Sequence, residues 1–245
     1  NLLQILIYLM STETSQKEKE SNQGIYQGLT FERASFQLEA CRALRNGENP
    51  LVVVPTGSGK TVVALDAIAH HLEKRGHIIY TAPIKALSLQ IYDEFSKIFG
   101  KEIVGLLTGD NKINTGAKIL IMTTEILRNS MFRQEEKEKE ISMEIYQWTF
   151  NPKDITLIIF DEVHFLYNKS RGHVWNDTIQ KAPENIQLVM LSATFDANPT
   201  VISWFNQKER TCRLIKRDKR PVPLTFNLYD GTKNHIIYKN SKWES

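Results

Sequence analysis

The chain has 245 residues, 41% of them hydrophobic and 24% charged, which is typical of a globular protein with a sizeable core. Its net charge of +3 is weak evidence for a polyanionic partner, and its two cysteines, Cys41 and Cys212, exclude a disulfide framework and a cysteine-based metal site. The apolar start, "NLLQILIYLM", is too short to span a bilayer, and no other apolar stretch is long enough. We therefore expect a soluble, intracellular protein with no membrane partner.

The N-terminal tail, residues 1–27, is expected to be disordered or non-native. Residues 1–9 precede Met10 and lack the basic region and cleavage site of a signal peptide, so we interpret them as upstream translation or the edge of a fragment. Residues 11–24 are polar and charged, with few apolar side chains, which favours disorder.

Periodic patterns begin near Leu29. The first predicted helix has apolar residues at Phe36, Ala40 and Leu44, and it ends at Gly47. The β-branched run "LVVV" at 51–54 predicts a strand buried on both faces. A second helical pattern follows over 60–75 and ends at Gly76.

Strands and helices continue to alternate along the chain. We predict a strand at 77–81, a helix at 84–100, and further strands in the runs "EIVGLL", "KILIM", "TLIIF" and "QLVML". This alternation predicts an α/β domain over residues 28–218, with a doubly wound, mostly parallel sheet. The mixed charges of 131–155 predict a solvated helix with pairs such as Glu135 to Lys139, although a partner site is the alternative. Residues 219–245 are expected to be a linker and the start of a second domain.

A glycine-rich loop lies between the 51–54 strand and the next helix, in the sequence "VVVPTGSGKTVVAL". Gly57 and Gly59 let backbone amides surround a phosphate, Lys60 supplies a positive charge, and the Thr61 hydroxyl is a ligand for Mg²⁺. A strict P-loop has glycine where this chain has Val54. A chance match in a loop is the alternative, but the flanking strand and helix favour a nucleotide site.

Two adjacent acids, Asp161 and Glu162, follow the apolar run "LIIF". In P-loop ATPases a carboxylate at the end of a neighbouring strand holds Mg²⁺, and a second carboxylate can take a proton from the attacking water. An acidic turn after a strand is the alternative. The P-loop upstream favours the catalytic interpretation.

Three motifs in this order, "PTGSGKT", "DEVH" and "LSAT", resemble superfamily two helicases of the DExH type. The stretches "TAPIKALSLQ", "LLTGD", "IMTTEILRNSMF", "RGHVWNDTI" and "KRPVPL" are similar to superkiller-type RNA helicases over roughly residues 29–228. The resemblance implies the first RecA-like P-loop NTPase domain of such a helicase, with a short segment leading to a missing second RecA-like domain. It also implies ATP and Mg²⁺ as cofactors.

The resemblance assigns roles by position. It implies that Gln37 reads adenine, that Thr61 and Asp161 hold the metal, and that Glu162 is the catalytic base, with Lys60 and Asp161 also catalytic. A surface glutamine and a structural histidine are the alternatives for Gln37 and His164. The expected ATP-binding residues are Gln37, Val54, Pro55, Thr56, Gly57, Ser58, Gly59, Lys60 and Thr61, and the expected coupling residues are His164, Ser192, Ala193 and Thr194.

Contacts with single-stranded RNA are expected where strands end and helices begin. Pro83, Lys85, Thr123 and Thr124 lie at such points, and helix N-termini and hydroxyls suit sugar–phosphate contact. Arg171 matches an arginine of the family, although the acids that usually flank it are replaced by "NKS" and an asparagine here. The basic run 213–221 has two equal interpretations, an RNA contact or a solvated face.

The sequence therefore predicts the ATP-binding half of an ATP-dependent RNA helicase, inactive alone, that serves RNA decay in the cytoplasm with exosome-associated proteins. A DNA helicase of the related repair group is one alternative. A truncated ATP- or RNA-binding module without turnover is the other.

Overall fold

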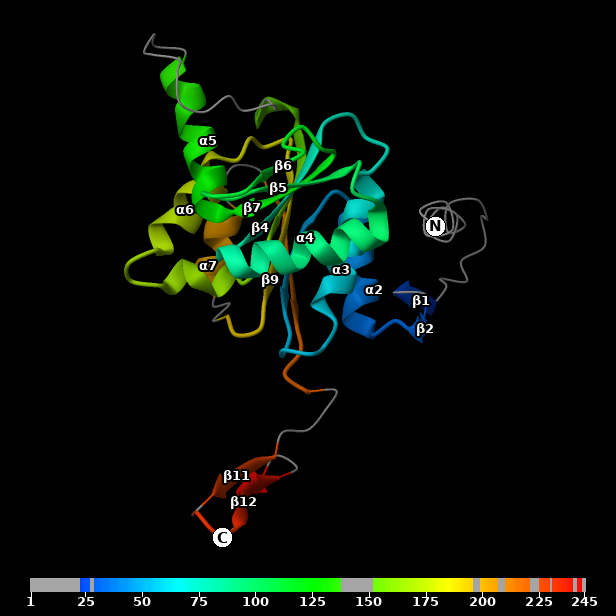
Figure 1. The fold of residues 1–245 in the computed structure, drawn as a ribbon, viewed down its shortest axis with the longest axis vertical. Coiled ribbons are helices and arrows are strands. Elements are labelled where there is room, and N and C mark those ends of the chain that lie inside the picture. The colour runs from blue at the N-terminus through cyan, green and yellow to red at the C-terminus, as the bar shows by residue number, and fades with distance from the viewer. Residues whose placement is uncertain are drawn as a thin grey trace.

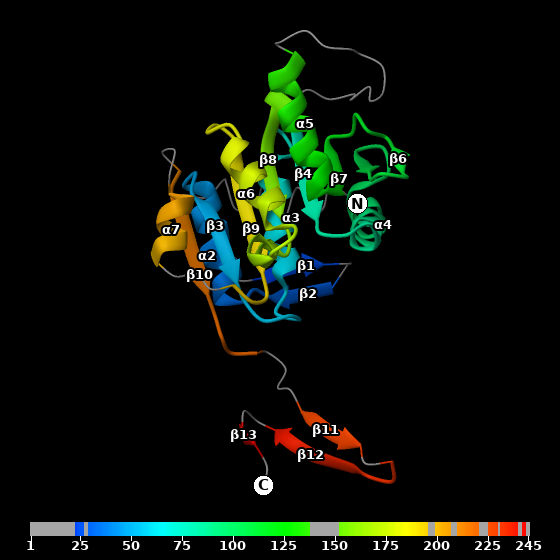
Figure 2. The same ribbon diagram turned by 90° about the vertical axis from the view of Figure 1, so that its left-hand side faces the viewer.

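A central mixed sheet carries helices on both of its faces, as Figures 1 and 2 show. The computed structural model describes residues 23–26, 29–137, 152–195, 199–206, 210–220, 225–229, 231–239 and 242–243. In these residues the strand order is β10-β3-β9-β8-β4-β7-β5-β6, and neighbours are parallel except for β5 and β6. The predicted doubly wound, mostly parallel sheet is confirmed.

The inner strands of this sheet, such as β7 and β8, are apolar along most of their length because both faces are covered, whereas the edge strands β6 and β10 carry exposed charged residues. In β8, Leu157 and Ile159 pack into one core, whereas Ile158 and Phe160 pack into the other. The strands are β3 (Asn49–Val53), β4 (His77–Ala82), β5 (Val104–Leu107), β6 (Lys112–Ile113), β7 (Ile119–Thr123), β8 (Ile155–Phe160), β9 (Gln187–Ser192) and β10 (Cys212–Lys216).

The helices divide between the two faces of the sheet. One core holds apolar residues of α2 (Ser35–Arg45), α3 (Lys60–His71) and α4 (Lys85–Phe99). The other core holds residues of α5 (Thr124–Lys137), the short 3-10 helix η2 (Val163–Tyr167), α6 (Gly172–Lys181) and α7 (Pro199–Phe205). A further 3-10 helix, η1 (Pro152–Asp154), precedes β8.

Helix α3 is shorter than predicted, because it ends at His71 instead of reaching Arg75. Turns lead from there to Gly76, which has a φ of +107° and would place a Cβ 1.9 Å from the carbonyl oxygen of Asp154. Only glycine fits at this close approach.

Short strands precede and follow the main domain in the sequence. β1 (Gln23–Tyr26) pairs with β2 (Leu29–Glu32), so structure begins before residue 28 and the prediction of a tail over 1–27 was too long at its end. Apolar residues at Ile25, Leu29 and Phe31 favour this hairpin over disorder. Residues 1–22 lie outside the described part of the chain, as does the expected pair of Glu135 and Lys139.

A three-stranded antiparallel sheet follows the main domain. It contains β11 (Phe226–Tyr229), β12 (Asn234–Lys239) and β13 (Lys242–Trp243), and Figure 2 shows it apart from the main sheet. Its assignment to a second domain stays a prediction. None of the helices described here is long and apolar enough to cross a membrane.

Candidate nucleotide and nucleic-acid site

The predicted site residues gather at one edge of the main sheet. Strands β3, β9, β8, β4 and β7 are parallel neighbours, so their carboxyl ends lie side by side. In a doubly wound sheet this edge is where ligands bind. We call the residues after β3 and β8 the phosphate side, and those after β4 and β7, together with Arg171, the strand side.

The phosphate side begins with a loop in which two glycines are needed. Gly57 and Gly59 have φ angles of +82° and +88°, in the left-handed region that favours glycine. A Cβ on Gly59 would lie 2.8 Å from Gln37 Nε2, so the missing side chain also leaves room for that amide. Helix α3 starts at the next residue, and its N-terminus favours an anion in the loop.

Lys60 is held over this loop by the main chain. Its Nζ donates to the carbonyl oxygen of Val54 over 3.2 Å, and burial lowers the pKa of Lys60 while the charges of Glu162 and Asp161 oppose that shift. The side chain of Val54 packs in the core, and the backbone φ of Val54 is not positive, so glycine is not required there. Only its carbonyl faces the lysine, which explains why valine can replace the glycine of the strict pattern.

Asp161 is fixed at both carboxylate oxygens. The Tyr80 hydroxyl donates to Oδ2 over 2.7 Å, and the backbone amide of Glu162 donates to Oδ1 over 2.9 Å. Burial raises the pKa of Asp161, and the hydrogen bond from Tyr80 opposes the increase. Glu162 itself has a φ of +53°, which is uncommon outside glycine and concentrates at functional sites.

The "DEVH" and "LSAT" motifs meet at His164. Its Nδ1 lies 3.3 Å from Ser192 Oγ and 3.1 Å from Glu162 Oε2, which is an ion pair only when the imidazole is protonated. Ser192 Oγ also donates to the Thr194 carbonyl over 3.1 Å, and Ala193 lies between them. The structure thus brings the expected coupling residues together, and their role in coupling stays a prediction.

Gln37 belongs to the phosphate side through both ends of its amide. Its Oε1 accepts from the Ala34 amide over 2.9 Å, and its Nε2 donates to the Gly59 carbonyl over 3.0 Å. The side chain is 4% exposed, so it ties the start of α2 to the P-loop. Its expected contact with adenine stays a prediction.

The phosphate side has the oxygen chemistry that Mg²⁺ needs. Among the described residues, no group of three or more His, Cys, Asp or Glu could hold a metal unaided. Mg²⁺ is usually bound by one or two carboxylates together with substrate phosphates, so Asp161 and the Thr61 hydroxyl beside the loop fit this pattern. In the same described part, the buried Ser58 Oγ lacks a hydrogen-bond partner, which leaves it available to a ligand, whereas Glu162 Oε2 has the His164 imidazole beside it.

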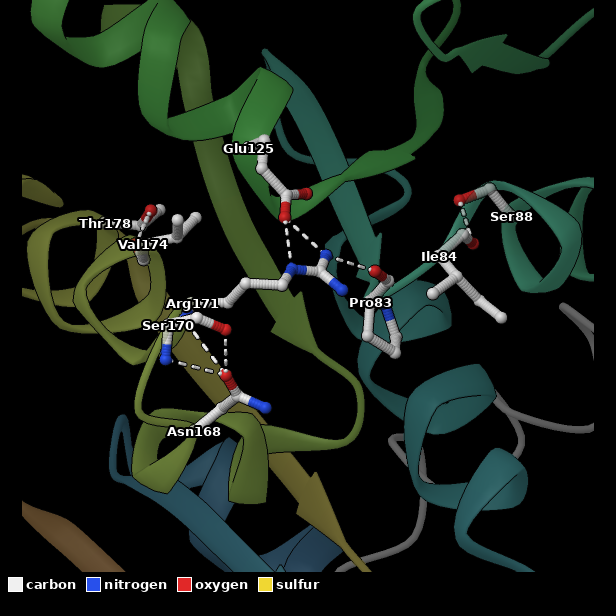
Figure 3. A network of polar contacts seen from close by, with 9 residues as sticks. All are labelled: Pro83, Ile84, Ser88, Glu125, Asn168, Ser170, Arg171, Val174 and Thr178. Carbon is white, nitrogen blue, oxygen red and sulfur yellow. Dashed lines mark hydrogen bonds and ion pairs between the residues drawn. The ribbon is translucent and has the colours of Figure 1, made fainter.

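The strand side is more enclosed than the sequence suggests. Pro83, Thr123 and Thr124 are buried, and the buried Thr124 Oγ1 lacks a hydrogen-bond partner among the residues described. Lys85 is exposed and forms an ion pair with Asp110. The Arg171 side chain donates to Glu125 of the same protein (Figure 3).

Sequence reasoning missed Tyr80 and Glu125. A tyrosine in an apolar strand next to the strand that ends at Asp161 is a usable signal, because β4 and β8 are neighbours with Tyr80 opposite Ile159. Glu125 stands beside the expected RNA-binding threonines, but its partner Arg171 is 46 residues away. A contact of that separation requires the fold.

Comparisons with known proteins agree with this geometry. The chain is 40% identical over 207 residues to the DExH-box ATP-dependent RNA helicase DExH9 of Arabidopsis thaliana, covering 84% of this chain and 19% of that protein. It is 38% identical over 200 residues to the antiviral helicase SKI2 of Saccharomyces cerevisiae, covering 81% and 14%. It is 39% identical over 206 residues to the exosome RNA helicase MTR4 of Mus musculus, covering 83% and 18%.

The chain therefore spans less than a fifth of each of these relatives, and its similarity to superkiller-type helicases is confirmed. The solved structure of the DUF1998 helicase MrfA bound to DNA and AMPPNP shares the fold, with a TM-score of 0.58 and 20% identity over 86% of this chain and 29% of that one. Residues 34–202 match the family of DEAD/DEAH box helicases. Because this match includes the P-loop, both acids and the Ser192 strand, the chain belongs to the DEAD/DEAH box helicase family.

Proposed function

We propose that the chain is the ATP-binding half of an ATP-dependent RNA helicase, which couples Mg-ATP hydrolysis to movement along single-stranded RNA. The observation that carries the proposal is the grouping of Lys60, Asp161 and Glu162 at one sheet edge, where their charges influence one another. Relatives named as RNA helicases support RNA over other substrates.

Each residue of the phosphate side has a task in this reaction. The amides of the glycine loop and the Lys60 ammonium hold the outer phosphates, and Gln37 holds the adenine side. Thr61 and Asp161 hold Mg²⁺, which supplies charge neutralisation at the phosphates when it is bound. Glu162 accepts a proton from the attacking water, and its φ of +53° is a backbone conformation that concentrates at functional sites.

The strand side contacts the sugar–phosphate backbone of RNA. The first turns of α4 and α5 present amide groups, and Lys85 adds a charge. His164 and Ser192 couple the state of the nucleotide to movement in our proposal, and they link the segment after β8 to the end of β9.

The remaining parts of the reaction belong to a second RecA-like domain, in our proposal. An arginine finger supplies about 10³- to 10⁵-fold in the rate of phosphoryl transfer. We therefore expect this chain alone to bind Mg-ATP weakly and to hydrolyse it hardly at all. Cytoplasmic RNA decay with exosome-associated proteins is the proposed setting, and the similarity to the exosome RNA helicase supports the exosome association alone.

The test is phosphate release by the chain joined to its second domain, with saturating ATP, Mg²⁺ and matched RNA or DNA single strands. RNA stimulation well above DNA stimulation supports the proposal. Equal or greater stimulation by DNA would favour a DNA helicase, as the DNA-bound MrfA structure permits. Nucleotide and RNA binding without turnover in the joined protein would favour a binding module.

A further inference from the structure

The Arg171 side chain joins three parts of the strand side (Figure 3). Its Nε donates to Glu125 Oε1 over 2.9 Å, its Nη2 contacts the same oxygen, and Nη2 also donates to the Pro83 carbonyl over 2.5 Å. Pro83 follows β4 and Glu125 lies in the first turn of α5. One guanidinium group therefore links the segment that leads into α4, the first turn of α5 and the start of α6.

Arg171 is itself held rigidly. Its guanidinium carbon lies 5.6 Å from the ring centre of Phe165 and 5.5 Å from that of Trp175, so it rests against two aromatic rings. Its backbone amide donates to Asn168 Oδ1 over 3.0 Å (Figure 3). A Cβ at Gly172 would lie 2.3 Å from the Leu166 carbonyl oxygen, so α6 is packed directly on η2.

These contacts make a short mechanical connection from Glu162 to both helix starts. Residue 162 is the last residue before η2, η2 packs on the start of α6, and Arg171 extends from that start to Glu125 and Pro83. We propose that Arg171 is a positioning residue, which holds the first turns of α4 and α5 together so that both face one nucleic-acid strand. The inference rests on the proposed function and replaces a direct contact between Arg171 and RNA.

The charges distinguish a clamp from a direct phosphate contact. Glu125 is an acid on the face where phosphates are expected, and Arg171 neutralises it. If Arg171 binds phosphate directly, Glu125 competes for it, and removing Glu125 strengthens RNA binding. If Arg171 is a clamp, removing Glu125 opens the clamp and weakens RNA binding. The two roles therefore predict opposite signs.

A matched control exists between the same two helices. Arg128 donates from Nε and Nη2 to Asp177 Oδ2 over 2.8 and 2.7 Å, which joins α5 to α6 away from the helix starts. Its side chain is 28% exposed and that of Arg171 is 35% exposed, so removing either one breaks an ion pair of similar burial.

The experiment measures anisotropy of a fluorescein-labelled oligouridylate with the 245-residue chain and its R171A, R171K, E125A, R171A/E125A and R128A variants. We expect R171A and E125A each to weaken binding about tenfold, the double variant to be no weaker than either, and R128A to bind like the parent. R171K should resemble R171A, because lysine keeps the charge but lacks the planar fork.

Tighter binding by E125A, or parental binding by R171K, would overturn the clamp in favour of a phosphate contact. Equal weakening by R128A would also overturn it, since any loosening of α5 against α6 would then suffice. Amide hydrogen exchange of residues 84–88 and 124–128 tests the clamp without RNA. Faster exchange in R171A but not in R128A supports it even if the parent binds no strand, which would refute only the proposed function, and unchanged exchange overturns it.

Discussion

At the ends of β3 and β8, polar atoms are left open, whereas at the ends of β4 and β7 most of them bind one another. Ser58 Oγ is buried without a hydrogen-bond partner among the described residues, and Glu162 Oε2 is paired only when the His164 imidazole, 3.1 Å away, is protonated. On the strand side, Arg171, Glu125 and Lys85 have their charges paired within the protein, and Thr124 Oγ1 is an exception. The phosphate side thus leaves groups for a ligand, and the strand side uses its groups on itself.

The difference follows from the ligand each side is proposed to hold. A phosphate cluster with Mg²⁺ needs donors and charges that the protein has not already used, and buried open groups are costly until the ligand arrives. The backbone of a nucleic-acid strand is held by amide groups and by shape, so the side chains on the strand side are free to position the helix ends. We call polar groups without a partner in the protein open, and polar groups paired within the protein closed. Substituting an open group should therefore change ligand binding or turnover, and substituting a closed group should change local geometry or the free energy of unfolding.

The largest effect should come from Glu162→Gln in the joined, turnover-competent protein. The amide has nearly the same shape but cannot take a proton from water, so we expect turnover to fall by about 10²- to 10⁴-fold while Mg-ATP binding persists. Steady-state phosphate release and a fluorescent-nucleotide titration measure the two quantities.

Asp161→Asn is the matched comparison, because it removes a metal-ligand charge and should raise the Mg²⁺ requirement itself. Parental turnover in both variants would mean that the two acids are only a turn at the end of β8.

Lys60→Ala should weaken binding of Mg-ATP by about 10- to 100-fold, since the phosphate cluster loses its main cation in a partly buried site. A fluorescent-nucleotide titration of the 245-residue chain measures it, with exposed Lys97→Ala as the control. Unchanged affinity in the Lys60 variant would refute the nucleotide site and, with it, the contrast between the two sides.

Much of the phosphate side could be predicted because its signals are local. Two glycines, a lysine and a hydroxyl in one loop, and two acids directly after an apolar strand, each specify chemistry within a few residues. The alternation of strands and helices likewise predicted the doubly wound, mostly parallel sheet. Val54 shows the limit of the pattern, because whether its side chain or its carbonyl faces the lysine depends on the packing of β3.

The strand side could not be predicted to the same depth because its contacts are distant in the chain. Arg171 reaches Glu125 and Pro83, which lie 46 and 88 residues away. The hairpin of β1 and β2 was missed for a different reason, since four apolar or aromatic residues among polar ones resemble a tail. Strand pairing, not composition, decided that segment.

A polar group paired within the protein should contribute to the free energy of unfolding, and His71 tests this expectation. It is 1% exposed, its Nδ1 is 3.0 Å from the Ala67 carbonyl and its Nε2 is 3.0 Å from Lys74 Nζ. Burial, with the Lys74 charge, lowers the pKa of His71 to about 4. The imidazole is therefore neutral when folded, donating from Nδ1 and accepting from Lys74.

Because the folded pKa lies below the unfolded value of about 6.5, the stabilisation is complete above pH 6.5 and is lost as pH falls towards 4. Between pH 7 and 5 the His71 contribution should fall by about 1 to 2 kcal/mol. Urea unfolding at both pH values measures it, and His71→Leu should lose less stability over this interval than the parent. Exposed His173→Asn is the control, and equal slopes in all three proteins would contradict the assignment.

The smallest effect should come from Tyr80→Phe, which removes one hydrogen bond within the protein from Asp161, a residue of the phosphate side. The ring stays packed edge-on against Phe95, 5.3 Å away, so the change is confined to the hydroxyl that donates to Asp161 Oδ2. Asp161 would then be oriented by the Glu162 amide alone. Losing one such hydrogen bond should raise the Mg²⁺ concentration needed for half-maximal ATP binding by about fivefold.

Nucleotide fluorescence against Mg²⁺ concentration measures this shift, and Tyr92→Phe, which alters a buried tyrosine on the same face of the sheet, is the matched control. If Tyr80→Phe shifts the Mg²⁺ dependence and Tyr92→Phe does not, metal binding on the phosphate side depends on the hydrogen bond from Tyr80 to Asp161. If neither variant shifts it, the carboxylate is oriented by the backbone alone. Asp161 would then belong to the groups that bind the ligand, and the Tyr80 hydroxyl would have no part in that binding.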